Sequence, residues 1–377
     1  MLCTGLSSVS RVSRSVMLLV GLATALSAVP LALGAGGASG PIVAGYRFTS
    51  FDVPGAFDTV AHHINNGGVI AGLWHDSTGA GHGFVRAKNG AIATFDGPLA
   101  VYTDPEGING NGDIVGWYYD ANFIQHGFLR DRDGTIQSID VSFAGNQGTV
   151  TWAINDAGEI SGYYIDANGN TQAFVRSRGG QITQVNVPGA TFGAESENVN
   201  NRGAIDGSSQ DADGTIHGFI RQADGSITVF DAPGAGSGSG LGTFTVDLSG
   251  NHRGLNERGD LTGSTLDSNL TFHGFLRTHD GTIMPFDVPG GGVGNFNGTT
   301  TSSLNSSGTI CGGFTDSNGF PHGFVRYRDG SIVPFDAPGV GSQTDPLVIN
   351  DPGEIAGLWF DANGVGHGFL MQPQGPQ

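Results

Sequence analysis

Four short apolar segments, separated by turn residues, recur in each stretch of about 45 residues along most of this chain. One such segment, Gly112–Tyr119, follows the pattern Gly-x-Ile-x-Gly-x-aromatic and has the length of a β-strand. The turns are rich in Gly, Asn and Asp, and Asn89-Gly90 and Asp133-Gly134 are strong short-range hairpin signals. The pattern predicts an all-β chain of many short strands joined by tight turns.

Three signatures mark the repeat, and each occurs seven times. The first is Phe-Asp-x-Pro-Gly or a variant of it, and its acidic or amide residues are Asp52, Asp96, Asp140, Asn186, Asp231, Asp287 and Asp336. The second is an aliphatic residue followed by Asn-x-x-Gly, and its asparagines are Asn65, Asn109, Asn155, Asn200, Asn256, Asn305 and Asn350. The third is His-Gly-Phe, or Gln-Ala-Phe in one copy, and its first residues are His82, His126, Gln172, His217, His273, His322 and His367.

The spacing between these signatures is fixed in one part of the unit and variable in another. Each signature Asn lies 17 residues before the next His or Gln, and that residue lies 14 residues before the next Asp or Asn in all six internal copies. From each Asp or Asn of the first signature to the next Asn of the second, the gap is 13, 13, 15, 14, 25, 18 and 14 residues. One rigid unit with a single tolerant loop is typical of a repeat architecture.

Each unit is expected to form four antiparallel strands, the last of which ends at Phe-Asp-x-Pro-Gly because proline cannot donate to a β-ladder. Seven such units match a seven-bladed β-propeller, with a straight solenoid as the alternative. The chain ends favour a ring, because a lone strand at 42–54 precedes the first unit and the final unit lacks its last strand. The sequence therefore predicts a propeller over residues 42–371, closed by the N-terminal strand, with a short disordered tail at 372–377.

Contacts of the motif side chains can also be predicted. If the third turn of each unit is a two-residue hairpin, Phe84 faces Phe95 across the strands, whereas a bulged turn would break this pairing. The equivalent pairs are Phe219–Phe230, Phe275–Phe286 and Phe324–Phe335. The arginine that follows each motif Phe by two residues is expected to pair with a carboxylate of its own or a neighbouring blade. These arginines are Arg86, Arg130, Arg176, Arg221, Arg277 and Arg326.

The recurring His-Gly-Phe or Gln-Ala-Phe, with Ile-Asn-x-x-Gly and Phe-Asp-x-Pro-Gly, resembles the HAF family of bacterial extracellular repeat proteins. The resemblance covers about residues 45–371, in seven in-register copies. It implies secretion and a repeat fold, and it supplies no catalytic residues. Gln172 and Met371 depart from the usual His and Arg and mark degenerate units.

The N-terminal segment does not fit the repeat. Arg11 and Arg14 precede an apolar run over residues 16–33, and small residues follow from Gly34. This order is typical of a secretory signal peptide, expected at residues 1–34, although cleavage after Ala35 or Ala38 also fits and a retained membrane anchor is the alternative. No later stretch is long and apolar enough to span a bilayer, so the mature chain is expected to be extracellular or periplasmic.

Composition narrows the range of partners. The formal net charge is −18, and no basic cluster follows the N-terminus, which argues against nucleic-acid binding. Cys311 is the only cysteine after the expected signal peptide, and it is expected to be a buried apolar residue of a monomer. No phosphate loop, zinc signature, nucleophile elbow or dinucleotide fingerprint occurs, so the sequence assigns no cofactor, metal ligand or catalytic residue.

Residues that recur in every unit are expected to build it. The motif histidines would be spread around a circle, too far apart to share one ion, so structural hydrogen bonds are expected for them. The Asp-x-(Asn/Asp)-Gly turns, such as Asp211–Gly214 and Asp316–Gly319, are expected to be plain hairpin turns, with weak calcium binding as the alternative.

Residues that interrupt the repeat are better candidates for ligand binding. The two longest connections contribute Phe244, Asp247, His252, Arg253 and Phe296. His62 and His63 form a pair found in no other unit, and one of them would point into the axial channel if the first strand of each blade is innermost. All seven are candidate contacts for an extracellular glycan, cell-surface component or protein.

The regular units and the missing catalytic constellation favour a noncatalytic binding propeller. A secreted enzyme that acts on a polysaccharide, as a lyase or hydrolase with its site at the axial mouth, is the alternative, because propellers also host such enzymes. That function requires His, Tyr, Arg or carboxylate side chains from different blades to converge at the axis. A structural exoprotein without a discrete ligand is the third hypothesis.

Overall fold

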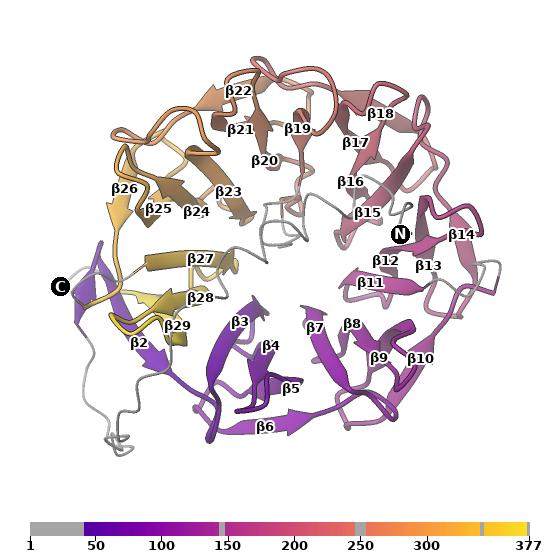
Figure 1. The fold of residues 1–377 in the computed structure, drawn as a ribbon, viewed down its shortest axis with the longest axis horizontal. Coiled ribbons are helices and arrows are strands. Elements are labelled where there is room, and N and C mark those ends of the chain that lie inside the picture. The colour runs from indigo at the N-terminus through magenta and orange to yellow at the C-terminus, as the bar shows by residue number, and fades with distance from the viewer. Residues whose placement is uncertain (1–40, 143–147, 246–253, 340–342, 375–377) are drawn as a thin grey trace, which may run out of the picture.

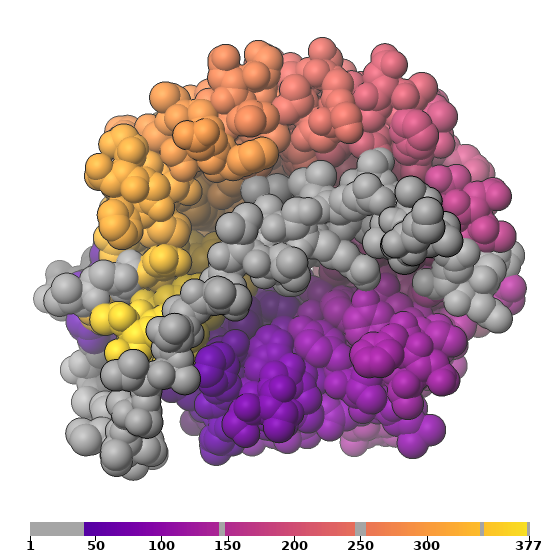
Figure 2. All heavy atoms as spheres, viewed as in Figure 1, coloured from indigo at the N-terminus to yellow at the C-terminus, as the bar shows by residue number. Residues whose placement is uncertain are grey.

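Short strands surround a central axis in the computed structural model, which describes residues 41–142, 148–245, 254–339 and 343–374 (Figure 1). The expected signal peptide, residues 1–34, lies outside the described residues. Consecutive strands pair antiparallel in groups of four, and Figure 2 shows these blades packed side by side. This arrangement confirms the predicted fold class, an all-β propeller of four-stranded antiparallel blades.

Each blade has an inner, a second, a third and an outer strand. The inner strands are β3 (Asp58–Ile64), β7 (Tyr102–Ile108), β11 (Thr149–Ile154), β15 (Gly193–Val199), β19 (Gly242–Phe244), β23 (Gly298–Leu304) and β27 (Gln343–Ile349). The second strands are β4 (Ile70–His75), β8 (Ile114–Tyr119), β12 (Ile160–Ile165), β16 (Ile205–Gln210), β20 (Leu261–Leu266), β24 (Ile310–Thr315) and β28 (Ile355–Phe360). The third strands are β5 (Gly81–Arg86), β9 (Gln125–Arg130), β13 (Thr171–Arg176), β17 (Ile216–Arg221), β21 (Phe272–Arg277), β25 (Pro321–Arg326) and β29 (Gly366–Pro373). The outer strands are β6 (Ile92–Phe95), β10 (Ile136–Ile139), β14 (Ile182–Gln184), β18 (Ile227–Phe230), β22 (Ile283–Phe286), β26 (Ile332–Phe335) and β2 (Tyr46–Phe51).

The two ends of the chain meet in one blade. Strand β2 pairs antiparallel with β29, so the N-terminal segment is the outer strand of the blade whose other strands are C-terminal (Figure 1). The expected single strand over 42–54 is instead a hairpin, because Ala44 and Gly45 adopt positive φ angles and turn β1 (Ile42–Val43) back onto β2. The tail expected from residue 372 is also wrong at its start, since β29 continues to Pro373 opposite Tyr46.

The predicted pairing of phenylalanines within a blade is wrong by one residue. Gly83, not Phe84, lies opposite Phe95, and the other blades with this Phe pair show the same shift. The turn is a three-residue loop in which Gly90 has φ +90° and its N–H bonds to the carbonyl of Ala87. This extra residue moves the register, and the small Gly83 accommodates the Phe95 ring above it.

The motif phenylalanines and arginines connect neighbouring blades instead. The Phe of each His-Gly-Phe or Gln-Ala-Phe is fully buried. Phe84 packs edge-to-face on Phe51 of the adjacent blade, with ring centroids 6.1 Å apart, and the Arg86 guanidinium lies 4.7 Å from the centre of the Phe51 ring. Arg130, Arg277 and Arg326 lie over the equivalent rings. Among the described residues none of these six arginines forms the expected ion pair with a carboxylate, and four of them make cation–π contacts instead.

A ring of asparagine side chains joins the inner strands. The Oδ1 atom of Asn65 accepts hydrogen bonds from the backbone of its own turn, at Gly67 and Val69, both at 3.0 Å. Its Nδ2 group donates to the carbonyl oxygen of Asn109 in the next blade at 2.9 Å. The same donation continues from Asn109 to Asn155, Asn155 to Asn200, Asn200 to Asn256, Asn256 to Asn305, Asn305 to Asn350 and Asn350 to Asn65. In these turns the glycine, such as Gly68 with φ +78°, adopts the left-handed backbone, and the ring asparagine does not.

The second strands carry a glycine that the inner strands require. A Cβ atom on Gly162 would overlap the carbonyl oxygen of Val150 on β11 and lie 3.1 Å from the Cα atom of Thr151. Equivalent glycines in the other blades, such as Gly72 and Gly312, meet an inner-strand carbonyl in the same way. The close approach coincides with a register shift in the inner strand, between Thr151 and Ala153 in this blade.

We expect Gly162→Ala to lower the free energy of unfolding by about 1–3 kcal/mol, because the added methyl group must push two paired strands apart. Urea denaturation followed by circular dichroism measures this change. Gly179→Ala is the matched control, because a Cβ at Gly179 has only the Ser177 hydroxyl nearby, at 3.9 Å. Equal denaturation midpoints for the two variants would contradict this account of the strand contact.

We expect Asn200→Asp to destabilise the protein by about 1–3 kcal/mol, because it keeps the oxygen that caps the turn but removes the donor to Asn256. The test is the shift in the urea midpoint at pH 7. Asn168→Asp, in an exposed turn, is the control and should leave the midpoint unchanged. A wild-type midpoint for Asn200→Asp would show that the bond between blades adds nothing to stability.

Candidate functional site

The inner strands are irregular at one recurring position. In six blades the pairing of the inner and second strands shifts three residues before the ring asparagine. The residues there, called the bulge residues below, are His62, Glu106, Trp152, Glu197, Ser302 and Leu347. The corresponding residue of the remaining blade, Arg253, lies outside the described residues. β-Bulges re-aim side chains and are common beside active sites.

The bulge residues vary although the surrounding unit repeats. Histidine, glutamate, tryptophan, serine and leucine occupy this position, whereas the residue three positions later is asparagine in every unit. Inner strands of neighbouring blades contact one another, so this position recurs on the innermost strand of six described blades. Five residue types occupy it in those six blades, and Glu106, Glu197, Ser302 and Leu347 are buried there.

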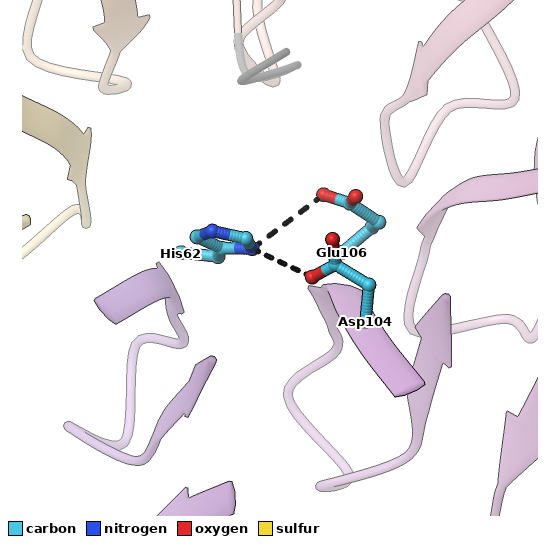
Figure 3. Close-up of side chains that lie close together, drawn as sticks. All are labelled: His62, Asp104 and Glu106. Atoms are coloured by element: carbon cyan, nitrogen blue, oxygen red, sulfur yellow. Dashed lines mark ion pairs between the residues drawn. The ribbon is translucent and has the colours of Figure 1, made fainter. Parts of the chain in front are cut away.

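One cluster combines side chains of two blades (Figure 3). The Nδ1 atom of His62, on β3, lies 3.3 Å from Oδ1 of Asp104 and 3.7 Å from Oε2 of Glu106, both on β7. Burial lowers the pKa of His62, but the facing carboxylates outweigh it and raise the pKa to about 9. At neutral pH without a bound cation, His62 is therefore a charged imidazolium between two acids.

Aromatic side chains adjoin this cluster. The indole Nε1 of Trp117 donates a hydrogen bond of 3.0 Å to Oε1 of Glu106. Tyr102 stacks on the Trp117 ring with centroids 5.5 Å apart, and its hydroxyl lies 3.3 Å from Nε2 of His75. A hydrogen bond to Asp58 raises the pKa of His75. The blades that carry β3 and β7 thus form a wall of aromatic, acidic and imidazole groups.

A second group of acids lies on β15 and β16. Burial raises the pKa of Glu195 to about 7 and holds that of Glu197 well above its ordinary value, with further repulsion from Asp206. Thr245 donates a hydrogen bond from its hydroxyl to Glu197. Asp206 is fully buried, neither of its carboxyl oxygens has a hydrogen-bond partner in the described residues, and burial raises its pKa to about 8.

The structure separates the candidates expected from the sequence. His62 lies on the innermost strand β3 beside Asp104 and Glu106 and is partly buried, whereas His63 is buried. Phe244 is buried against Phe272, and Phe296 is half exposed in the loop before β23. The structure does not bring these phenylalanines into the cluster around His62. The remaining candidates, Asp247, His252 and Arg253, lie outside the described residues.

Sequence reasoning missed Asp104, Glu106, Trp117, Glu197 and Asp206. One signal in the sequence points to two of them, because Glu106 and Glu197 occupy the variable position three residues before an invariant asparagine. The other three have no such mark, since their role depends on contacts between strands of different units.

The repeated polar residues are structural in the described blades, as expected. His82 bonds through Nδ1 to Asp96 at 2.8 Å, and the other five motif histidines make the equivalent bond. In the Asp-x-Asn-Gly turns, Oδ1 of Asp166 accepts the backbone N–H groups of Asn168 and Asn170. These turn carboxylates are thus hydrogen-bonded to their own backbone.

Comparison with known proteins supports the fold class. No protein-family model matches the chain, and no curated protein matches it. Among solved structures, it is similar to a streptogramin B lyase, with 14% identity and a TM-score of 0.56 over 86% of this chain and 97% of that chain. A catalytically inactive virginiamycin B lyase from Staphylococcus aureus with quinupristin has 13% identity and a TM-score of 0.56, over 86% and 99%. The BP39L lectin from Burkholderia pseudomallei has 9% identity and a TM-score of 0.52, over 85% and 99%.

These likenesses define the chain as a β-propeller and show nothing beyond the fold, because the identities are low. Both lyases and lectins are built on this architecture. In the described part of the chain, no helix has the length and apolar character needed to cross a bilayer.

We expect Asp206→Asn to be more stable than the wild type at pH 8 and to differ less from it at pH 5. An unfolded aspartate has a pKa of about 4, so the folded state binds the proton more tightly, and the stability gained from it is lost as pH rises from about 4 to 8. Thermal melts across this range measure the effect. Because Glu195 and Glu197 also titrate with raised pKa values, the variant should keep part of the dependence of stability on pH. Asp224→Asn, at an exposed position, serves as control. An unchanged pH slope in Asp206→Asn would contradict the buried carboxylic acid.

Proposed function

We propose that the protein is a secreted propeller that binds an extracellular glycan or another polyhydroxylated cell-surface component in its axial channel. The observation that carries the proposal is the variation of the bulge residues inside an otherwise regular repeat. Residues that build blades recur, whereas residues that contact one asymmetric ligand must differ from blade to blade. The channel wall is where the described units differ most in chemistry.

The groups on this wall suit a hydroxyl-rich ligand. Carboxylates of Asp104 and Glu106 accept hydrogen bonds from hydroxyl groups, and the imidazolium of His62 donates them. Tyr102 and Trp117 supply apolar surface with a polar edge, which is the usual mixture in ligand pockets. The acids on β15 and β16 add further acceptors, or donors where they stay protonated.

Charge restricts the class of glycan. The chain carries a net charge of −18, and carboxylates outnumber the imidazole groups in the His62 cluster. Acidic polysaccharides and nucleic acids are disfavoured by this field, whereas neutral sugars and amino sugars are not. We therefore propose a neutral or amine-bearing glycan as the ligand, and a monomeric protein as its receptor.

We also propose that the protein is secreted. The charge–apolar–small order of residues 1–34 supports export, and the resemblance to the HAF family supports an extracellular location. A glycan of the cell surface would be accessible to the mature chain in that compartment.

Catalysis on the bound glycan is the second candidate function. It is favoured by Glu195, whose pKa is raised to about 7, because a carboxylic acid that titrates near neutrality is suited to general acid or base catalysis. His62 is less suited to the role of general base, since its neighbours keep it protonated.

We expect a neutral or amine-bearing glycan, found on an array of surface glycans, to bind the mature chain by calorimetry, and Glu106→Gln and Trp152→Ala to weaken that binding at least tenfold. Removing a hydrogen-bond acceptor or an aromatic ring from a ligand pocket costs about 1–3 kcal/mol. Glu257→Gln, at the asparagine end of the channel, is the control and should bind normally.

Binding that both channel variants retain would contradict the axial site, and the absence of binding to every glycan would contradict the proposed ligand class. Loss of the intact glycan and appearance of new reducing or unsaturated ends would favour the enzyme instead. That activity should then disappear in Glu195→Gln.

A further inference from the structure

We propose that His62, Asp104 and Glu106 bind one divalent first-row metal ion, Zn²⁺ or Mn²⁺, in the axial channel. The three side chains come from β3 and β7 of neighbouring blades and converge on one point (Figure 3). The ligand atoms, one from each residue, all lie within 4.8 Å of one another. This site does not depend on the proposed glycan, because its residues and geometry stand without any second ligand.

The spacing of the ligand atoms fits a single small ion. Metal–ligand distances of about 2.1 Å in a tetrahedral site place neighbouring ligand atoms about 3.4 Å apart. The distances from Nδ1 of His62 are 3.3 Å to Asp104, 3.7 Å to Glu106 and 3.1 Å to the carbonyl oxygen of Pro105. The backbone oxygen of Pro105 lies near the same His62 nitrogen and is a further oxygen that an ion held there could meet.

A buried oxygen that lacks a well-aligned hydrogen bond also points to a cation. Asp104 is only 5% exposed, and its Oδ1 atom has no hydrogen-bond partner in the described residues, although it faces His62. The Nδ1 atom of His62 instead makes its hydrogen bond with the Pro105 carbonyl. The His62 ion pair at 3.3 Å is therefore the partner of this buried oxygen, and direct coordination of a cation would compensate its burial better.

A neighbouring side chain orients one ligand. The Trp117 indole bonds to Oε1 of Glu106, which leaves Oε2 as the oxygen that faces His62. Groups of this kind, which fix the direction of a ligating carboxylate, are a regular part of metal sites. Glu106 is itself buried, so little water can reach its carboxylate and bind it in place of a metal ion.

The donor set selects the class of metal. Ca²⁺ and Mg²⁺ prefer six or more oxygen ligands and ordered waters, whereas imidazole favours Zn²⁺ and the other later first-row ions. Two carboxylates and a carbonyl beside one imidazole suit Zn²⁺, and Mn²⁺ is the first-row ion best matched to the oxygens. Binding would replace the proton on Nδ1 of His62 and neutralise the two carboxylates.

The test is calorimetric titration of the chelator-treated mature chain with ZnCl₂, MnCl₂, MgCl₂ and CaCl₂. We expect one site that binds Zn²⁺ or Mn²⁺ at least tenfold more tightly than Mg²⁺ or Ca²⁺. The bound ion should also raise the melting temperature.

Substitutions of the proposed ligands test whether these residues form the metal site. Asp104→Asn and Glu106→Gln should weaken binding at least 100-fold, and Trp117→Phe by about tenfold through loss of carboxylate orientation. His217→Gln is the control. The two ring nitrogens of His217 face different carboxylates, Nε2 toward Asp211 and Nδ1 toward Asp231, so this substitution should leave the metal affinity unchanged. Circular dichroism and the melting temperature of each metal-free variant verify that it is folded.

Three outcomes would overturn the proposal: no binding of any of the four ions, equal affinity for all of them, or tight binding that folded Asp104→Asn and Glu106→Gln proteins retain. Glycan binding measured in the presence of a chelator is a separate experiment. Failure of the metal site therefore leaves the glycan hypothesis intact, and failure of glycan binding leaves the metal titration valid.

Discussion

The hydrogen bond from one asparagine side chain to the backbone of the next blade is the constraint on which the rest of the molecule depends. Each ring asparagine uses its oxygen to fix its own turn and its amide to hold the carbonyl of the following asparagine. Because both uses come from a single buried side chain, turn geometry and blade spacing cannot vary separately. The bond from Asn350 to Asn65 extends the series across the two ends of the chain. These bonds hold the inner strands at one height along the axis, so equivalent residues of the blades lie at the same level.

This regularity creates a position that is free to vary. Three residues before the ring asparagine, six of the described inner strands bulge, and a glycine on the second strand makes room for the displaced backbone. The residue type at the bulge varies although the rest of the unit repeats, so the blade tolerates a change there. His62, Glu106 and Glu197 are products of that freedom.

The sequence predicts what depends on one unit and fails where two units meet. The fold class, the strand order within a blade and the structural role of the motif histidines follow from local patterns. The register of Phe84 was wrong because Asn-Gly fits both a two-residue loop and a bulged one, and only the strand pairing decides between them. Arg86 was assigned to a carboxylate because no local pattern reveals the Phe51 ring of the adjacent blade. Asp104 and His62 are separated by 42 positions, so nothing in the chain marks them as neighbours.

The two acidic parts of the channel differ in a way that bears on function. Around His62 two carboxylates face one imidazolium, so the cluster keeps a net negative charge that favours a cation. Around Glu197 burial and mutual repulsion favour neutral carboxylic acids, which can donate as well as accept hydrogen bonds. Asp206 deepens this contrast, since it places a carboxyl group where the other blades have Ala, Val, Ser, Thr or Cys. A buried acid without a hydrogen-bond partner lowers stability, and natural proteins tolerate such departures mainly at functional sites. Asp206 also adds to the repulsion that helps to raise the pKa of Glu197, so this departure from the repeat acts on one of the bulge residues.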